Sequence, residues 1–370
     1  LSIQLTPGET RTVPLKLMPK IGLVDFRVGK NEEVLVNGES IGIGPKRRRY
    51  KAIDLFVEVR RNGYRSIKQK IRPSPVRTVM VRGGLQSLQH LAIQNAKPAY
   101  RNAAGQEMLL FKPSEKFYMG ASRGERGQRA NEFIRQVQLD RWFYAALHET
   151  TNAAFKSFRK QHIAANNKPV HSLTWIEAAM FCNWLSKKSG LPSFYKILDD
   201  RILGFDAKSN GYRLLTEAEW EWLARKAGRS KRTIFTWGDK EVVPENAGNI
   251  ADETAKGTVK FFVPRYSDGY VGTAPVGSFN KEKSGLFDLF GNVSEWVNDA
   301  YILALPKRGN IEVNPLRNSV GPYHVVKGSN FRSGNLTTLR ASYRDGSKGK
   351  RPDVGFRVGR YLYMEFAEDE

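Results

Sequence analysis

Two short helix-start signals lie in a long stretch of irregular sequence, and they constrain the fold more than any other feature. From about Met108 to Arg360 the chain is rich in Trp, Gly and Asn, and few segments keep a regular apolar spacing. Within it, Thr174–Glu177 and Thr216–Glu219 are capping boxes, in which each side chain bonds the other residue's backbone amide. We therefore predict a domain of a few short helices separated by long irregular connections.

The apolar spacing after each capping box predicts which face of each helix is buried. The expected inward residues are Trp175, Ala179, Cys182 and Leu185 in the first helix, and Trp220, Leu223 and Ala227 in the second. Gly190 with Pro192, and Gly228, are expected to end these helices. Cys182 is the only cysteine, which excludes an intramolecular disulfide and a thiolate-rich metal site. Its place on an apolar face indicates a small buried side chain rather than a nucleophile.

The first 83 residues have a pattern typical of β structure. A strand followed by the turn Asn37-Gly38 and a second strand over residues 54–60 predict a small β-domain over residues 20–83. Residues 71–81 resemble residues 5–15, so residues 1–19 are expected to be the end of a preceding β repeat, or N-terminal strands. Residues 84–107 are expected to form a linker that contains a short helix.

The chain is strongly basic, with a net charge of +23. Residues 1–82 hold 18 lysines and arginines against 7 acidic residues, and the basic run Lys46–Lys51 is expected in a loop. Lys46, Arg47, Arg48 and Arg49 form a weak candidate site for anions, and the alternative is a solvated surface. We do not expect nucleic-acid binding, because no ladder of aromatic residues accompanies the run.

Composition excludes two classes of protein. At 40% hydrophobic and 11% aromatic residues the chain is not a disordered one. No run approaches the roughly 20 consecutive apolar residues that a membrane-spanning helix needs. Because the sequence begins at Leu1 without a methionine, we expect it to be a mature or trimmed form.

Residues 108–362 resemble the formylglycine-generating enzyme, or sulfatase-modifying factor, family. The segments that carry the resemblance are 117–120, 149–155, 170–175, 181–185, 212–222, 268–270, 273–278, 285–296 and 354–357. The resemblance implies an irregular α+β fold related to C-type lectins, followed by an acidic tail over residues 363–370. Val36-Asn37-Gly38 and Asn62-Gly63-Tyr64 resemble the PEGA family, which implies a small extracytoplasmic β-sandwich before it.

The resemblance also indicates which residues of this chain occupy the family's catalytic positions. Family enzymes oxidise a cysteine of a target sulfatase with oxygen and with copper held by two cysteines in a Cys-x4-Cys arrangement. Those positions fall here on Ser333 and Thr338, and neutral hydroxyl oxygens are poor ligands for the soft Cu(I) ion. A sister branch holds iron with three histidines, but the 5 histidines here show no metal-ligand spacing. The expectation is a degenerate domain that binds no copper and is not an oxidase.

The positions that the resemblance assigns to calcium keep suitable oxygen ligands. The first set is Asn249, Ile250, Asp268 and Tyr270, and the second is Asp288, Gly291, Val293 and Glu295. The alternative is that both segments are simply turns. If calcium binds, it would stabilise loops that no helix or strand holds.

Together these features favour a non-catalytic, calcium-stabilised binding or regulatory protein in the periplasm or another extracytoplasmic space of a bacterium. The expected partner is a protein of the cell envelope, with an anionic polymer or lipid headgroups as further possibilities. By analogy with relatives that lack the cysteine pair, it would be an accessory of a secretion system such as type VI, or of the envelope. Two alternatives stay open: an oxidase or other modifying enzyme that acts without the cysteine pair, and a polyanion-binding protein.

Overall fold

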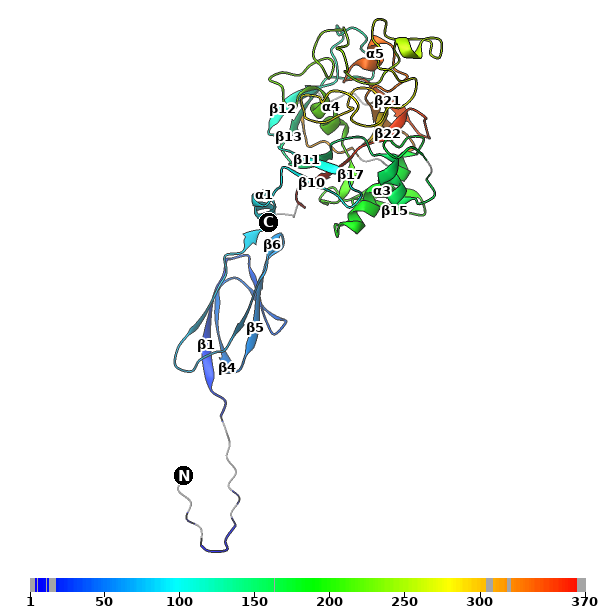
Figure 1. The fold of residues 1–370 in the computed structure, drawn as a ribbon. Helices are drawn as coiled ribbons and strands as arrows, with labels where there is room; N and C mark the ends of the chain where they lie inside the picture. The colour runs from blue at the N-terminus through cyan, green and yellow to red at the C-terminus, as the bar shows by residue number, and fades with distance from the viewer. Residues whose placement is uncertain are drawn as a thin grey trace. The chain divides into compact units, whose positions relative to one another are not determined.

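The chain forms two compact units, the first extending to Leu91 and the second beginning at Ala92. The computed structural model describes residues 4, 6–10, 12, 18–162, 164–303, 309–317 and 321–364, and Figure 1 shows the course of the chain. The strands predicted within residues 1–19 lie mostly outside the described residues, as does the acidic tail beyond residue 364. Among the described residues, no helix is both long enough and apolar enough to cross a membrane.

The first unit is a small β-sandwich, as predicted. One sheet of the sandwich has the strand order β4-β1-β8 and the other has the order β3-β2-β5-β7, while β6 and β9 form a separate two-stranded sheet. The strands are β1 (Ile21–Arg27), β2 (Glu33–Val36), β3 (Glu39–Ile43), β4 (Lys46–Lys51), β5 (Leu55–Arg60), β6 (Tyr64–Arg65), β7 (Ile67–Ile71), β8 (Val79–Arg82) and β9 (Gln86–Ser87). Apolar residues of both sheets, including Phe26 and Val57, form one buried cluster. At the predicted hairpin, Asn37 and Gly38 have φ values of 52° and 86°, which suit a tight turn between antiparallel strands.

The prediction that the basic run forms a loop is wrong, because Lys46–Lys51 is strand β4. It pairs antiparallel with β1 at the edge of its sheet, where charged side chains can extend from the strand into water. Arg47 lies opposite Asp25 and its Nε is 3.1 Å from Asp25 Oδ1. The sequence does not indicate this strand, because the charged residues of β4 leave neither of its faces apolar.

The linker prediction for residues 84–107 is correct only in part. Helix α1 (Leu88–Gln94) is the predicted short helix. Strands β10 (Ala99–Arg101) and β11 (Glu107–Phe111), however, already belong to the five-stranded sheet of the second unit. Short strands with mixed polar residues gave no periodic signal in that part of the sequence.

The second unit is an irregular α+β domain with four sheets, in agreement with the predicted fold class. The strand orders are β10-β11-β14-β23-β17, β12-β13-β19, β15-β16 and β21-β20-β18-β22. The remaining strands are β12 (Glu115–Met119), β13 (Arg135–Leu139), β14 (Phe143–Ala146), β15 (Tyr195–Leu198), β16 (Arg201–Phe205), β17 (Tyr212–Leu214), β18 (Ser294–Ala300), β19 (Ile311–Val313), β20 (His324–Lys327), β21 (Arg344–Ser347), β22 (Val354–Phe356) and β23 (Val358–Tyr361). Long connections such as residues 226–293 contain only the short 3₁₀ helix η1 (Glu253–Ala255).

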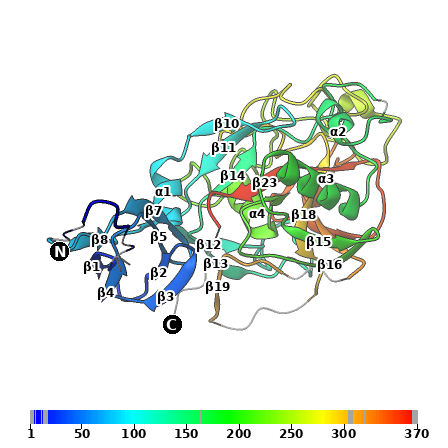
Figure 2. The same ribbon diagram turned by 90° about the horizontal axis from the view of Figure 1, so that it is seen from below.

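Two of the four helices described in the second unit, α3 and α4, begin where the capping boxes predicted. The four helices are α2 (Asn152–Phe158), α3 (Trp175–Lys188), α4 (Glu217–Arg225) and α5 (Leu336–Leu339). Both predicted capping boxes are present, at Thr174 for α3 and at Thr216 for α4. Figure 2 shows α3 and α4 beside the strands of the unit, where α3 contacts β17 and α4 contacts β18.

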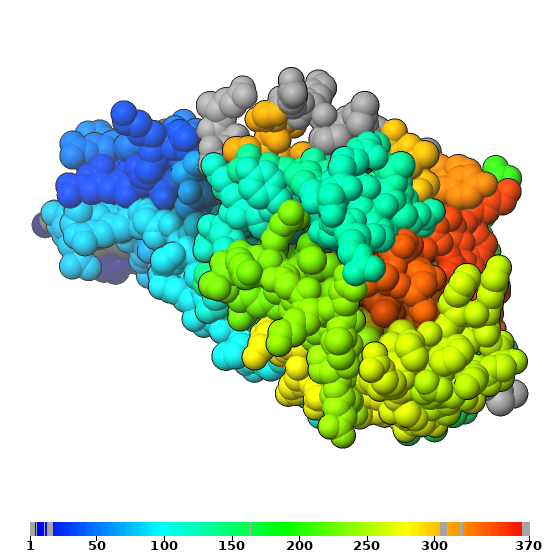
Figure 3. Space-filling view, turned by 90° about the horizontal axis from the view of Figure 1, so that it is seen from above, coloured from blue at the N-terminus to red at the C-terminus, as the bar shows by residue number. Residues whose placement is uncertain are grey.

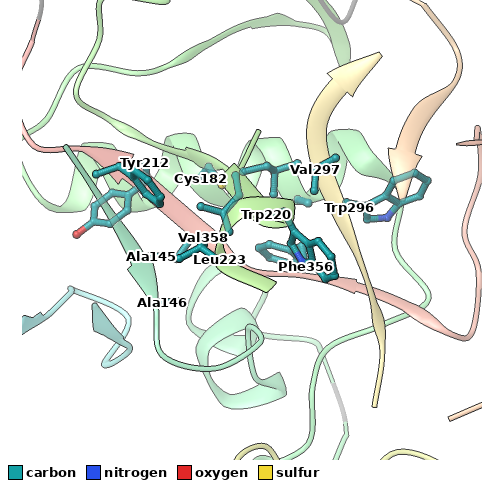
Figure 4. Close-up of a cluster of buried hydrophobic side chains, with 14 of the residues drawn as sticks. Ala145, Ala146, Cys182, Tyr212, Trp220, Leu223, Trp296, Val297, Phe356 and Val358 are labelled. Atoms are coloured by element: carbon teal, nitrogen blue, oxygen red, sulfur yellow. The ribbon is translucent and has the colours of Figure 1, made fainter. Parts of the chain in front are cut away.

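The core of the second unit contains the predicted inward faces of α3 and α4. Cys182 is fully buried and lies with Leu223 and Val358 in one apolar cluster (Figure 4). Burial raises the pKa of the Cys182 thiol, which keeps the thiol protonated and unreactive. The two largest buried rings bond polar atoms, since Trp220 Nε1 donates to Glu295 Oε2 at 2.9 Å and Trp296 Nε1 donates to Leu173 O at 3.1 Å.

Candidate functional site

Ser333 and Thr338, the two positions that the resemblance assigns to copper-binding cysteines, lie on the chain between β20 and β21. Ser333 is buried, and its Oγ accepts a hydrogen bond of 3.1 Å from the Asn330 backbone amide. Thr338 lies in α5, where its Oγ1 donates to the Asn335 carbonyl at 3.0 Å. Both hydroxyls therefore hold local backbone structure. Neither supplies the thiolate that Cu(I) requires.

An open cavity of about 480 Å³ adjoins these two positions. Its lining comes from two segments that are far apart in the sequence, residues 258–261 with Val271 on one side and Phe331, Arg332 and Asn335 on the other. The segments touch at Gly334, where an added Cβ would lie 2.0 Å from the Phe261 backbone oxygen. Figure 3 shows the orange-red surface of the segment that contains α5 beside the yellow surface of residues near 250–265.

The first predicted calcium set is brought together around Asp268. Its Oδ2 accepts from the Ile250 amide at 2.8 Å and its Oδ1 accepts from the Tyr270 amide at 2.7 Å. Asn249 is fully buried, and its Oδ1 has no hydrogen-bond partner. The sequence did not single out Asp252, a buried carboxylate that accepts a hydrogen bond from the Asp268 amide. Burial, with a further contribution from Asp252, raises the pKa of Asp268 to about 7.

The second predicted set fits a cation at Asp288 better than at Glu295. Asp288 Oδ2 accepts from the Gly277 amide at 2.7 Å, whereas its buried Oδ1 has no hydrogen-bond partner. Glu295 is already paired with Arg357, with Nη2 2.8 Å from Oε1. The Val293 amide donates to Glu149 Oε1 at 3.0 Å. Glu295 would therefore have to share its charge between the guanidinium and any metal.

Gly291, the fourth member of this second set, joins it to the first. An added Cβ there would lie 2.2 Å from the Asn249 backbone oxygen, and the φ of Gly291 is 86°. Only glycine adopts this conformation at such a close approach without strain. The two predicted sets thus belong to one packed structure.

An excess of buried carboxylates surrounds Asp288. Burial, followed by the charge of Asp288, raises the pKa of Glu149 well above its ordinary value and that of Glu282 to about 8. Burial raises the pKa of Asp288 itself to about 6. Arg357 neutralises Glu295 and leaves the other three carboxyl groups without a salt-bridge partner among the described residues. A buried cation, or a proton on each, would remove this electrostatic cost.

Both sets fit calcium in the chemistry of their donors, which are carboxylate, amide and carbonyl oxygens. Among the described residues, no three His, Cys, Asp or Glu side chains are grouped so that they alone could hold a metal. Backbone carbonyls and the Asn249 amide would therefore have to complete each site. Glu149 is the acidic residue that opens the segment 149–155, and its charge within that segment is the sequence signal that points to it.

The weak anion site predicted at Lys46, Arg47, Arg48 and Arg49 lies along β4 of the first unit. Its charges are partly used within the unit. Asp25 pairs with Arg47, and Lys46 Nζ donates to the Ile43 carbonyl at 3.1 Å. Arg48 Nη2 donates to the Ile41 carbonyl at 3.2 Å.

The irregular α+β fold and the loop that carries Ser333 and Thr338 define a domain of the sulfatase-modifying factor type. Residues 67–362 match the family described as sulfatase-modifying factor enzyme 1-like domain, and the chain belongs to this family. It is 22% identical to PvdO from Pseudomonas aeruginosa, whose solved structure superposes with a TM-score of 0.55 over 72% of this chain and 99% of that one. That likeness shows the shared fold.

Curated relatives include enzymes and a protein described as inactive. The chain is 29% identical over 170 residues to the formylglycine-generating enzyme of Mus musculus, a match to 45% of this chain and 36% of that enzyme. It is 30% identical over 134 residues to the inactive C-alpha-formylglycine-generating enzyme 2 of Bos taurus, covering 36% of this chain and 33% of that protein. It is 27% identical over 241 residues to the chaperone protein LppX of Paenibacillus barcinonensis, covering 59% and 80%.

Proposed function

We propose that this chain is a non-catalytic binding protein built on a formylglycine-generating-enzyme-like scaffold. The observation that carries the proposal is the pair of hydroxyls at Ser333 and Thr338, each committed to a local backbone hydrogen bond. A site that activates oxygen on Cu(I) needs soft sulfur ligands, and the only cysteine is buried in the core. The similarity to a relative described as inactive agrees with this proposal.

Calcium is proposed as the structural ion of this scaffold. Asn249 and Asp268 with the carbonyls of Ile250 and Tyr270 would hold one ion, and Asp288 and Glu295 with the carbonyls of Gly291 and Val293 would hold another. When bound, calcium supplies positive charge that replaces the protons on buried carboxyl groups. The unpartnered oxygens of Asn249 and Asp288 support this assignment.

The setting that we propose is extracytoplasmic, with a protein of the bacterial cell envelope as the partner. The β-sandwich of the first unit would act as a PEGA-like spacer and the second unit would bind the partner, as an accessory of a secretion or envelope system. The name of the LppX relative describes a chaperone, which is a binding role for that protein. Arg47 and Arg48 of β4 contribute less to polyanion binding than their charge implies, because Asp25 engages Arg47 and a backbone carbonyl engages Arg48.

An oxygen-uptake assay tests the proposal. The protein is supplied with Cu(I) and with cysteine-containing peptides, and dissolved oxygen is followed with an electrode beside a blank that contains the copper and the peptides without the protein. We expect uptake equal to the blank. Peptide-dependent turnover above the blank would contradict the proposal and favour an oxidase that works without the cysteine pair.

A further inference from the structure

The cavity beside Ser333 combines unpaired positive charge with exposed aromatic surface. Of its lining side chains, Lys260 and Arg332 are cationic and none is acidic. Neither cation forms a salt bridge with any described residue. Each instead lies over a ring, with Lys260 Nζ 5.3 Å from the Phe261 centroid and Arg332 Cζ 5.2 Å from the Phe331 centroid.

The acidic residue whose charge Arg332 influences is already neutralised. Arg332 is one of the groups that hold the pKa of Asp353 below its ordinary value, but the larger effect comes from Arg351. Arg351 Nη2 lies 2.7 Å from Asp353 Oδ2, and a second nitrogen, Nη1, lies 2.9 Å from Asp345 Oδ2. The positive charge at the cavity is therefore left for a ligand.

We infer that this cavity binds an acidic peptide segment of a protein partner, one that carries an apolar or aromatic residue between carboxylates. The inference rests on the proposed function and names the chemistry of the partner that it implies. Carboxylates of the segment would pair with Lys260 and Arg332, and its apolar side chain would pack between Phe261 and Phe331. Charge complementarity of this kind selects the partner and steers its approach.

The exposure of the lining favours a peptide over a small metabolite, and its apolar part favours a peptide over a uniform polyanion. The volume of about 480 Å³ lies within the range of roughly 300–1,000 Å³ that is usual for ligand pockets. Most of the lining is exposed, including Phe261 at 56% and Val271 at 50%, so an extended chain can lie across the cavity without being enclosed. A uniform polyanion would use the two cations but would leave this apolar surface in contact with water.

Fluorescence polarisation on the full chain tests the inference. The probe is a fluorescein-labelled peptide of sequence Asp-Glu-Leu-Asp-Phe-Glu, compared with the same peptide in which Asn and Gln replace the acidic residues. We expect saturable binding of the acidic probe below about 100 μM, and affinity at least tenfold weaker for the amide probe. Raising the salt from about 50 to 500 mM should weaken the binding of the acidic probe.

Variants locate the binding. Lys260→Glu and Arg332→Glu should each weaken the acidic probe about tenfold, whereas Lys116→Glu, an exposed change on β12 outside the cavity, should leave it unchanged. Phe261→Ala should weaken both probes, since it removes apolar contact. Because these side chains are exposed, melting temperatures should stay within a few degrees of the parent.

Other results would overturn the inference. One is the absence of binding at millimolar acidic probe, and another is equal binding by the parent and both charge-reversal variants. A third is tight binding to vesicles of anionic lipid that survives these variants, because it would assign the charge recognition to another surface. None of these results would show that the protein is an oxidase. The proposed non-catalytic function is therefore tested separately, by oxygen uptake.

Discussion

Replacing Asp288 by asparagine tests how the second unit holds its buried carboxyl groups. In the unfolded chain Asp288 loses its proton near pH 3.8, whereas in the folded protein burial raises its pKa to about 6. The folded state therefore binds this proton more tightly. The stability that the proton contributes is fully present below about pH 4 and is lost as the pH rises through 6. The difference between the two values corresponds to about 3 kcal/mol.

Calcium should replace this lost stability, because the ion favours the charged carboxylate. At a free calcium concentration of 100 times the Kd, binding adds about 2.7 kcal/mol to the free energy of unfolding. In the calcium-free protein the contribution of Asp288 to stability should thus fall between pH 4 and pH 7. The calcium-loaded protein should keep most of its stability across that range, and the effect of calcium should shrink below pH 6, where protons compete.

Urea unfolding followed by tryptophan fluorescence measures these effects in the right part of the molecule. All 7 tryptophans lie between Trp142 and Trp296, so the signal reports on the second unit alone. Asp288→Asn should remove about 3 kcal/mol of the pH dependence without calcium and should weaken the response to calcium. The matched control is Asp299→Asn, because burial raises the pKa of Asp299 to about 7 but Asp299 belongs to neither calcium set.

The control should flatten the pH dependence and keep the full calcium response. If calcium does not change the free energy of unfolding of the parent or of either variant, the assignment of Asp288 to a calcium site is refuted. An Asp288→Asn variant whose calcium-free stability changes between pH 4 and pH 7 as much as that of the parent would refute the burial argument itself.

Three further predictions concern stability and reactivity. Arg357→Leu should lower the free energy of unfolding in urea by about 3 to 5 kcal/mol, because it leaves the Glu295 carboxylate buried without its partner. The double variant with Glu295→Leu should recover part of this loss. Equal losses in the single and the double variant would contradict the prediction. The Cys182 thiol should react with Ellman's reagent only after denaturation, and fast reaction of the native protein would show that it is not buried. Gly334→Ala should lower the free energy of unfolding by about 1 to 3 kcal/mol, because the added Cβ would collide with the Phe261 backbone oxygen. The control is Gly349→Ala, whose added Cβ has no atom within 4 Å, and it should lower the free energy of unfolding by less than half as much.

Local features of the sequence predicted the parts of the fold that local interactions decide. Each capping box spans only four residues and its bonds form within them, so Thr174 and Thr216 could be read directly from the sequence. The buried face containing Cys182 followed from helical spacing in the same way. Tertiary pairing decided the rest. Strand β4 exists because it pairs with β1, and its own charges give no strand pattern.

The candidate site shows the same division. The identities of Ser333 and Thr338 were visible in the sequence, but the cavity beside them is not, since about 70 residues separate its two walls. Asp252 was missed because its contact with Asp268 depends on how a long connection folds back on itself. The pairing of Glu295 with Arg357 likewise joins segments about 60 residues apart. Charge balance at a buried site cannot be read without such pairings.

Mass spectrometry of a cysteine-containing sulfatase peptide incubated with Cu(I) and oxygen tests the central claim most directly. The parent protein and a Ser333→Cys/Thr338→Cys variant are compared with copper alone, and the mass of the peptide cysteine is followed over time. We predict that the parent leaves the peptide at the level of the copper blank. The variant shows whether two restored cysteines are enough for oxidation of the peptide. Oxidation of the peptide cysteine by the parent, beyond that blank and with repeated turnover, would contradict a non-catalytic role.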